Sequence, residues 1–435
     1  MLGKRILYVQ YTNPAPYSPL QNSARILADK GWRVRFLAIG ALGVADQFRL
    51  PSYPNIEVRQ WRFSRPGLRQ KLHYLAFGFW AAWNVLRWRP SWVYASDSLI
   101  CPIALALSFL PGVRVLYHEH DSPSDENVES RKQKVEIEKA ETLKSEKLKE
   151  QNRERKADDG RQTTDDRSPT SDFRPPASGF QRFILWSRKK LARRAALCVL
   201  PNEQRVEVFK QTTGTSRPVY CVWNTPAHSE VIGEENRSSS EPLKLFYQGS
   251  IVPTRTPVSL ILAMAVVASP VELFVAGFET NGNLTHGQLL KEEAVRLGVI
   301  DRFHRLAPIP LRADLLKVSS QAHVGLAFMP MHGGDLNERA MTGASMKPFD
   351  YLASGLALLV SDLPDWRKMF VEPGYGLACN PADPESIAQA LRWFTEHPKE
   401  TREMGERGRQ RILSEWNYEN QFAVVVKVLS DSSKV

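Results

Sequence analysis

Cysteine is scarce in this sequence, and its placement excludes the sites that cysteine clusters build. Four cysteines occur among 435 residues, far apart and without a CxxC pair. Neither a zinc knuckle nor a disulfide framework is therefore expected, and a reducing compartment suits the chain. The N-terminal segment holds one short apolar run followed by prolines, which is too little for a signal peptide. We expect a cytoplasmic protein.

Long hydrophobic runs are also missing. No segment reaches the ~20 apolar residues that cross a bilayer. The closest is residues 72–86, a stretch that contains His73 and Asn84 and is followed by Arg87 and Arg89. This pattern favours a buried core helix, with a membrane-surface helix that has a basic flank as the alternative.

The glycine motifs that bind phosphate in dinucleotide enzymes and P-loop enzymes are absent. No GxGxxG opens the first helix, and no GxxxxGK[ST] occurs in the chain. The first loop, residues 11–23, has no glycine at all. Hydride transfer with a dinucleotide and P-loop phosphoryl transfer are therefore disfavoured.

What the chain has is a folded composition with excess positive charge. Hydrophobic residues make up 43%, charged residues 24%, and the formal net charge is +11. A basic body suggests an anionic partner, such as nucleotide phosphates, acidic lipid headgroups or nucleic acid. No nucleic-acid recognition motif accompanies the charge, so we expect no nucleic-acid partner.

Short β-branched runs alternate with helical stretches along most of the chain. This alternation is typical of parallel βαβ units whose sheet has both faces covered. It occurs twice in succession, which predicts two doubly wound domains. The predicted strands are residues 4–10, 34–39, 56–61, 91–96, 113–118, 195–201, 217–224, 243–249, 271–277, 323–330 and 356–362.

Composition places the boundaries between these units. Residues 1–225 are predicted to form the N-terminal Rossmann-like domain, and residues 226–242, rich in Ser, Glu, Gly and Pro, a linker. Residues 243–415 form the second Rossmann-like domain, and residues 416–435 a helix expected to pack back on the first. Residues 121–178 are highly charged with no apolar stripe, so we predict a disordered or solvated insertion.

The most informative stretch is residues 345–362, SMKPFDYLASGLALLVSD. Lys347 stands near a helix start, where free backbone N–H groups already attract anions. Asp350 lies on the same face, and a short carboxylate there can accept two hydrogen bonds from ribose hydroxyls. A cation for phosphate and an acid for ribose describe a nucleoside-diphosphate pocket. The alternative is a surface helix whose Lys and Asp are merely solvated.

A second candidate element is residues 248–257, QGSIVPTRTP, which follow the first strand of the second unit. Arg255 in this loop is suited to stabilise a diphosphate leaving group, because a guanidinium is a fixed, permanently charged donor. The alternative interpretation is a surface arginine that precedes a helix started by Pro257.

Together these motifs resemble a GT-B glycosyltransferase, in particular family 4 of retaining nucleotide-sugar transferases. SMKPFDYLASGLALLVSD resembles the family pattern S-x-K-x-F-E-Y-[ML]-A-x-G-x-P-V-[IV]-x-[ST]-D, and YQGSIVPTRT resembles Y-x-G-x-x-x-x-x-[KR]-G. GWRVRFLAI, RPSWVYASD, VLYHEHD, VLPNEQ and VYCVWNTP match in family order over nearly the whole chain. The resemblance implies an α/β GT-B fold, with two doubly wound domains that face a cleft.

The resemblance also implies a donor site, in which Asp350 matches the ribose-binding glutamate, Lys347 a donor contact and Arg255 the basic residue that holds the diphosphate. The whole donor-binding set is Arg255, Lys347, Asp350, Ser345, Gly249 and Ser250. Such enzymes need neither a metal nor a cofactor, because Arg and Lys neutralise the leaving phosphate of the nucleotide-sugar donor.

Two histidines are implied to be catalytic. His120 matches the first-domain histidine beside the transferred sugar, and His118 stands next to it. The alternative for His120 is a strand-end histidine that is hydrogen-bonded in the interdomain cleft. The sugar is expected to move to an acceptor hydroxyl with retention of its anomeric configuration.

One departure from the family keeps a second hypothesis open. The acidic pair of the family needs an acid at Thr342, and Glu338 is nearby but out of register. The first hypothesis is a transferase that builds surface polysaccharide or glycolipid on a glycan or lipid-linked acceptor. The basic helix 181–194 then rests on an anionic membrane surface, although a core-facing helix with exposed Arg and Lys is favoured. The alternative is a non-catalytic GT-B-like nucleotide-binding or scaffold protein.

Overall fold

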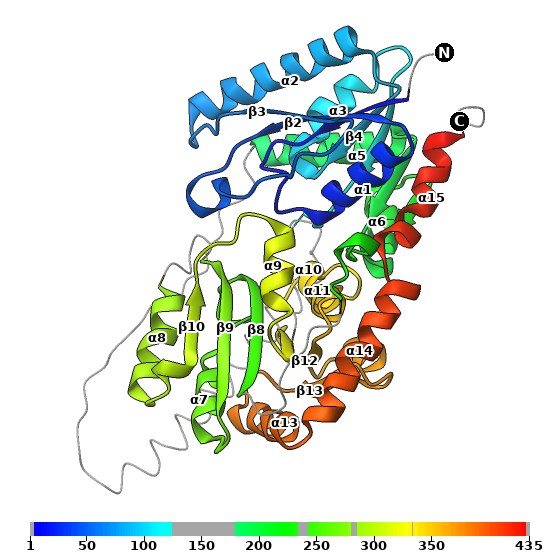
Figure 1. Cartoon of the computed structure of the whole chain (residues 1–435). Helices are drawn as coiled ribbons and strands as arrows, with labels where there is room; N and C mark the ends of the chain where they lie inside the picture. The colour runs from blue at the N-terminus through cyan, green and yellow to red at the C-terminus, as the bar shows by residue number, and fades with distance from the viewer. Residues whose placement is uncertain (1–3, 124–178, 234–241, 280–284, 333, 432–435) are drawn as a thin grey trace, which may run out of the picture.

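Two parallel β-sheets, each covered on both faces by helices, make up the computed structural model of the chain (Figure 1). It describes residues 4–123, 179–233, 242–279, 285–332 and 334–431. The predicted insertion, residues 121–178, lies outside this part of the chain except for its first three residues. Of the predicted linker, residues 226–242, residues 234–241 also lie outside it, whereas residues 226–233 are described and contain a short 3-10 helix, His228–Glu230.

The N-terminal sheet has seven strands in the order β3-β2-β1-β4-β5-β6-β7, and all of its neighbouring strands are parallel. Side chains alternate between the faces, so Leu7 and Val9 of β1 enter one core while Ile6 and Tyr8 enter the other. The strands are β1 (Arg5–Val9), β2 (Arg33–Ile39), β3 (Ile56–Trp61), β4 (Trp92–Ser96), β5 (Arg114–His118), β6 (Leu197–Leu200) and β7 (Val219–Cys221).

The C-terminal sheet has six strands in the order β10-β9-β8-β11-β12-β13. Both sheets therefore reverse direction beside their first strand, at β1/β4 and at β8/β11. Ligands of open α/β sheets bind at the carboxyl ends of the strands at such a reversal. The strands are β8 (Leu243–Ser250), β9 (Val271–Phe278), β10 (Phe303–Leu306), β11 (Val324–Ala327), β12 (Ala357–Ser361) and β13 (Gly376–Cys379).

Helices cover both faces of each sheet and bury the strands between them. On the N-terminal sheet, one core is closed by α2 (Leu68–Trp88), α3 (Cys101–Leu107), α5 (Gly179–Arg194) and α6 (Glu203–Thr213), the other by α1 (Ser18–Asp29) and α15 (Tyr418–Ser430). The remaining helices belong to the C-terminal unit: α7 (Val258–Val266), α8 (His286–Arg296), α9 (Arg312–Ser319), α10 (Leu336–Arg339), α11 (Lys347–Ala353), α12 (Pro364–Trp366), α13 (Pro384–Glu396) and α14 (Pro398–Ser414).

The last helix of the chain returns to the N-terminal unit. α15 follows α14 along the side of the molecule and lies beside α1 (Figure 1). Its Tyr418, Phe422, Val425 and Leu429 are buried in the same core as Trp32. The chain thus crosses between the units twice, once before β8 and once after α14.

The predicted pair of doubly wound α/β units is confirmed by this topology. The short edge strands β10 and β13 were not predicted, because a strand at a sheet edge lacks the continuous apolar run of a central one. The prediction of a buried helix at residues 72–86 is correct for only one face of the helix. α2 is buried on one face but exposes large apolar side chains on the other. Within the described residues, no helix is both long and apolar enough to span a bilayer.

Candidate functional site

The reversal point of the C-terminal sheet brings two predicted donor-binding cations together. Gly249, the last residue but one of β8, adopts φ +124°, and a side chain at this position would collide with the Lys347 side chain. The loop after β8 carries Arg255, which donates to the backbone oxygen of Phe328 at 3.1 Å, just beyond β11. Lys347 opens α11, and its Nζ lies 5.9 Å from the ring of Tyr247.

The charge on Lys347 is poorly accommodated in the structure. Burial and the neighbouring Arg255 lower the pKa of Lys347 to about 8, while Asp350 acts in the opposite direction. Burial also lowers the pKa of Arg255, partly offset by Tyr247 and by the charges of Glu338 and Asp121. No carboxylate of the described residues forms an ion pair with either cation. An anion placed between them would relieve this repulsion.

The side chain of Asp350 has buried partners that the sequence did not predict. It is fully buried, and both carboxylate oxygens accept hydrogen bonds from Arg312, at 2.6 and 2.9 Å. Gln248 donates to the same carboxylate at 2.7 Å. The expected role of Asp350 as a ribose ligand does not fit this arrangement, because a ribose hydroxyl would have to displace a charged bidentate partner.

Arg312 extends this contact toward the N-terminal unit. Its Nε donates to Glu230 at 2.7 Å, and Glu230 also accepts from Asn22 of α1 at 2.9 Å. Burial alone would lower the pKa of Arg312, but the two carboxylates Asp350 and Glu230 outweigh it and raise that pKa. This network joins α1, the segment before β8, α9 and α11 through buried groups.

The other two predicted donor-site residues flank these cations. Ser250 ends β8, and its backbone oxygen accepts a hydrogen bond from Tyr247 at 2.5 Å. Ser345 is buried in the turn before α11, with its N–H donating to Met341 at 2.8 Å. The six predicted donor residues therefore lie at the carboxyl end of β8, in the loop that follows it and at the start of α11, with Asp350 turned inward.

Glu338 supplies an acid near the position where the family pattern lacks one. It lies on the short helix α10, half-buried, and accepts from the N–H of Gly334 at 2.9 Å. Its negative charge is near enough to raise the pKa of Arg255 slightly. The sequence spacing placed this acid out of register with the family pattern. Only the fold of residues 334–346 brings its charge near Arg255.

The histidines lie at the carboxyl end of β5 in the N-terminal unit. His118 is completely buried, and its Nδ1 is 2.5 Å from the Tyr94 hydroxyl. The His120 ring lies 4.1 Å from the His118 ring, and its Nε2 is 3.0 Å from Ser96 Oγ. Burial, with a smaller effect of Arg205, lowers the pKa of His120 to about 3. Burial also lowers the pKa of His118, so the structure favours the neutral form of both imidazoles.

Asp97 is an acidic group beside these histidines that the sequence interpretation did not single out. It directly follows β4 and adopts φ +76°, a positive φ that is uncommon outside glycine. Burial raises its pKa to about 6, with smaller contributions from Asp121 and Glu119. The sequence did contain a signal for Asp97, because it is the aspartate that ends the RPSWVYASD match.

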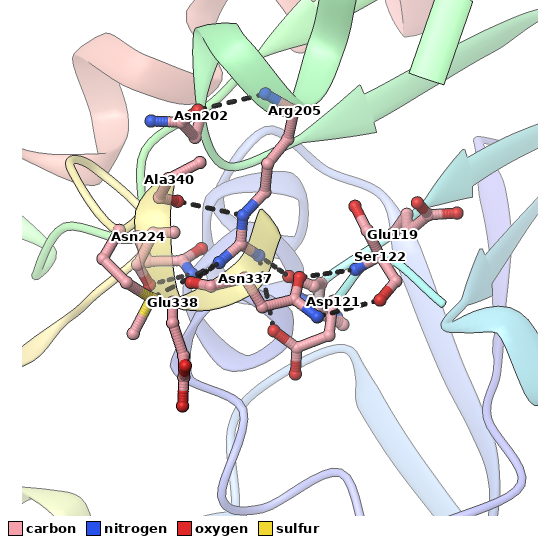
Figure 2. Close-up of polar contacts among 12 residues, drawn as sticks. Glu119, Asp121, Ser122, Asn202, Arg205, Asn224, Asn337, Glu338 and Ala340 are labelled. Atoms are coloured by element: carbon pink, nitrogen blue, oxygen red, sulfur yellow. Dashed lines mark hydrogen bonds and ion pairs between the residues drawn. The ribbon is translucent and has the colours of Figure 1, made fainter. Parts of the chain in front are cut away.

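A buried arginine from the N-terminal unit holds the loop of the C-terminal unit (Figure 2). Arg205 of α6 is 1% exposed, and its guanidinium donates to the backbone oxygens of Ala340, Asn337 and His120 at 3.0, 3.0 and 2.8 Å. Asn202 adds a bond to Thr342 at 2.7 Å. This contact places the segment that contains Glu338 directly against the segment that contains His120.

The same segments are joined by a second pair of bonds. Asn337 accepts from the N–H of Ser122 at 2.9 Å and donates to its backbone oxygen at 2.8 Å (Figure 2). Asn224 donates to Ala344 at 2.8 Å. The segments that carry His120 and Glu338 are therefore held together across the two units. Among the described residues, no His, Cys, Asp and Glu side chains gather into a metal-binding group.

Two family models match the chain. One described as "Glycosyl transferase 4-like domain" matches residues 20–222, and one described as "Glycosyl transferase-like" matches residues 286–426. The first match lies within the N-terminal unit, and the second begins after β9 of the C-terminal unit and extends into α15. No curated protein sequence matches the chain significantly.

Solved structures of low sequence identity share the whole fold. Sucrose-phosphate synthase from Thermosynechococcus elongatus is 14% identical with a TM-score of 0.66, and 98% of each chain is covered. HepE from Anabaena, in complex with UDP and glucose, is 14% identical with a TM-score of 0.65, covering 98% of this chain and 99% of that one. WaaG, a glycosyltransferase involved in lipopolysaccharide biosynthesis, is 13% identical with a TM-score of 0.60 and the same coverage.

Proposed function

This chain is a GT-B glycosyltransferase that resembles family 4, and we propose that it moves a sugar from a nucleoside-diphosphate donor to an acceptor hydroxyl with retention. The observation that carries the proposal is the pair of cations Arg255 and Lys347 at the carboxyl end of β8. They lie where doubly wound sheets bind ligands, and they lack carboxylate partners in the described residues.

In the proposed reaction, the bond between the anomeric carbon and the diphosphate oxygen breaks as the bond to the acceptor oxygen forms. The acceptor proton passes to the departing phosphate, and entry on the face of departure retains the configuration. Arg255 and Lys347 stabilise the negative charge that develops on the diphosphate, which is the role of a divalent ion in other transferases. The reaction proposed here therefore needs neither a metal nor a cofactor.

The N-terminal unit supplies the acceptor side. Neutral His120 lies beside the transferred sugar and acts as a hydrogen-bonding group rather than as a cation. The related HepE structure contains UDP and glucose, which supports a uridine nucleotide as the first donor to test. WaaG acts in lipopolysaccharide biosynthesis, which supports surface polysaccharide or glycolipid as the product class.

Calorimetric titration with UDP, GDP and ADP tests the donor site. We expect one nucleotide to bind, and Arg255→Ala and Lys347→Ala each to lose about 1.5–3 kcal/mol, the range for hydrogen bonds to charged groups. Lys291→Ala, an exposed lysine on α8, is the matched control and should leave affinity unchanged. Unchanged affinity in both site variants would refute the assignment.

A non-catalytic nucleotide-binding protein is the second candidate. Two observations favour it. Thr342 occupies the position where the family pattern has an acid, and the carboxylate of Asp350 is already paired with Arg312. A panel of nucleotide sugars with product detection separates the two functions. Binding without sugar transfer or slow donor hydrolysis would favour the second candidate, whereas transfer to any acceptor would exclude it.

A further inference from the structure

The outer face of α2 carries a continuous row of exposed apolar side chains. Six of them are between 57% and 77% exposed: Leu68, Leu72, Leu75, Phe79, Trp83 and Leu86. The opposite face of the same helix is buried in the N-terminal core through Tyr74, Phe77, Ala81 and Val85. α2 is therefore apolar on two faces, and only one of them has a partner within the described residues.

The six residues form a straight row. Steps of four, three, four, four and three residues separate them, which average to the 3.6-residue period of an α-helix. They share one side of the helix over about 27 Å. α2 lies along the outer edge of the N-terminal unit, away from the C-terminal unit (Figure 1). A row of this length on a rigid helix presents a nearly flat apolar surface.

Exposed aromatic side chains also lie on the neighbouring helix α5 and just after α3. On α5, Phe180, Phe183 and Trp186 are 40–53% exposed, and the Phe180 ring packs on Tyr74, on the buried face of α2, with ring centroids 5.6 Å apart, which fixes the start of α5 beside α2. Phe109 after α3 is 64% exposed, with Arg194 of α5 lying 3.9 Å from its ring. We call the six residues of α2 with these four aromatic residues the outer patch. Exposed apolar surface of this extent marks an interaction site.

The charge around the outer patch has one sign. Neither α2 nor α5 contains an Asp or Glu. Exposed basic residues of the two helices surround the patch: Arg69, Lys71, Arg87, Arg182, Lys189, Lys190, Arg193 and Arg194. A second copy of the chain seated symmetrically would bring equal positive charges together. Anionic lipid headgroups would neutralise them while the apolar row enters the acyl boundary.

A cavity of about 380 Å³ opens beside the outer patch. It lies at the carboxyl ends of β1 and β2, with Tyr11 and Leu42 among its lining residues. Lys71 at the start of α2 and Phe180 of α5 line the cavity and also belong to the exposed surface. The cavity mixes apolar side chains with the polar groups of Thr12 and Gln70, which suits a polar head attached to an apolar chain.

We propose that the outer patch rests on an anionic phospholipid bilayer, and that the cavity receives the head of a lipid-linked acceptor whose chain stays in that bilayer. The choice of acceptor rests on the proposed glycosyltransferase function. The bilayer contact does not, because it follows from the surface of α2 and α5 alone.

Vesicle flotation tests the bilayer contact. The full chain is mixed with vesicles of phosphatidylglycerol and phosphatidylcholine in equal parts, and with vesicles of phosphatidylcholine only. We expect binding to the anionic vesicles that weakens as salt is raised, since headgroup attraction is screened. The double variant Phe79→Ser/Trp83→Ser should lower the bound fraction roughly tenfold or more, because binding scales with the buried apolar area.

The matched control is Leu289→Ser/Val295→Ser, which removes two exposed apolar residues from α8 in the C-terminal unit. It should bind vesicles like the unaltered chain. Because Phe79 and Trp83 are exposed, their removal should leave the thermal unfolding temperature nearly unchanged, which separates lost binding from lost folding.

Three results would overturn the bilayer contact. They are no flotation of the unaltered chain with anionic vesicles, equal flotation of the Phe79/Trp83 variant, or a dimer in light scattering that this variant converts to a monomer. Nucleotide calorimetry on the same preparations keeps the two proposals apart. Vesicle binding without nucleotide binding would refute only the donor site, and the reverse would refute only the outer patch.

Dodecyl maltoside below its micelle concentration probes the cavity, with maltose as the chain-free control. We expect calorimetric binding of the alkyl sugar only, and a loss of roughly tenfold in Gln70→Trp, which fills the cavity while leaving the outer patch intact. Equal binding of maltose, or equal binding by Gln70→Trp, would overturn the assignment of the cavity to a lipid-linked acceptor.

Discussion

The fold disfavours the protonated form of Lys347. Its pKa is lowered to about 8 by burial and by Arg255, whereas an unfolded lysine releases its proton near pH ~10.4. The unfolded chain binds more protons between these values, so the contribution of Lys347 to stability is lowest below pH 8 and rises above it. A bound diphosphate reverses this preference, because it favours the protonated lysine.

Nucleoside-diphosphate affinity should therefore fall as the pH rises through 8, by up to about tenfold per pH unit. Calorimetry at a series of pH values measures this slope. Lys347→Met should bind more weakly at neutral pH and lose the slope, because Arg255 stays charged throughout. A slope that persists in Lys347→Met would assign the titration to another group.

Arg205 positions two segments through a geometry that lysine does not reproduce. Its fork bonds the backbone oxygens of His120, Asn337 and Ala340, and a lysine ammonium cannot span all three. We expect Arg205→Met to lower the free energy of unfolding by about 2–4 kcal/mol, since several buried carbonyls lose their donor. Urea denaturation measures this value, and Arg217→Met, at an exposed arginine, is the control.

Arg205→Lys separates positioning from folding. It keeps the charge and much of the stability, so a fall in turnover at nearly unchanged donor KM is expected once an activity is in hand. Turnover equal to that of the unaltered chain would show that Arg205 only stabilises the interface.

At the scale of elements, α15 completes a core that belongs to the other end of the chain. Phe422 is fully buried against the N-terminal sheet and stacks on Tyr418 with ring centroids 5.5 Å apart. Phe422→Ala should lower the free energy of unfolding by about 3–5 kcal/mol, the usual cost of a buried phenylalanine. Val424→Ala on the same helix removes a side chain that is 37% exposed and should cost less than about 0.5 kcal/mol.

Chemical denaturation of both variants tests this role of α15. An equal effect of the two substitutions would mean that α15 is not part of the N-terminal core in solution.

At the scale of the whole molecule, Arg312 ties the two units through buried charge. It bonds Asp350 and Glu230, and Glu230 contacts Asn22 of α1. Arg312→Met leaves two buried carboxylates without their partner, which should cost about 3–5 kcal/mol. Arg296→Met breaks an exposed ion pair with Glu293 and should leave the free energy of unfolding nearly unchanged.

The same network has a defined pH dependence. Burial alone would raise the pKa of Glu230, but Arg312 outweighs it and holds that pKa below the usual 4.5. Its contribution to stability is present above pH 4.5 and is lost as the pH falls through the lowered value. The difference between the unaltered chain and Arg312→Met should therefore shrink in acid, and thermal unfolding at several pH values measures it. A constant difference would contradict this origin.

The sequence by itself determined the two doubly wound units, because the alternation of apolar strands and helices is a local property that each segment carries. It also indicated Arg255 and Lys347, since both stand within a few residues of a strand end or helix start. The sequence also led us to expect that the last helix, within residues 416–435, packs back on the first unit. The edge strands β10 and β13 and the exposed row of α2 were missed, because both depend on what lies beside an element.

Only the tertiary structure decided which charges meet. Asp350 faces Arg312 from 38 residues away, and Arg205 reaches a loop more than 130 residues further along the chain. No local pattern encodes such contacts, since they arise when two separately patterned units dock. Ionic attraction in a buried interface depends on distance and desolvation, and both are fixed by the packed fold rather than by neighbouring residues.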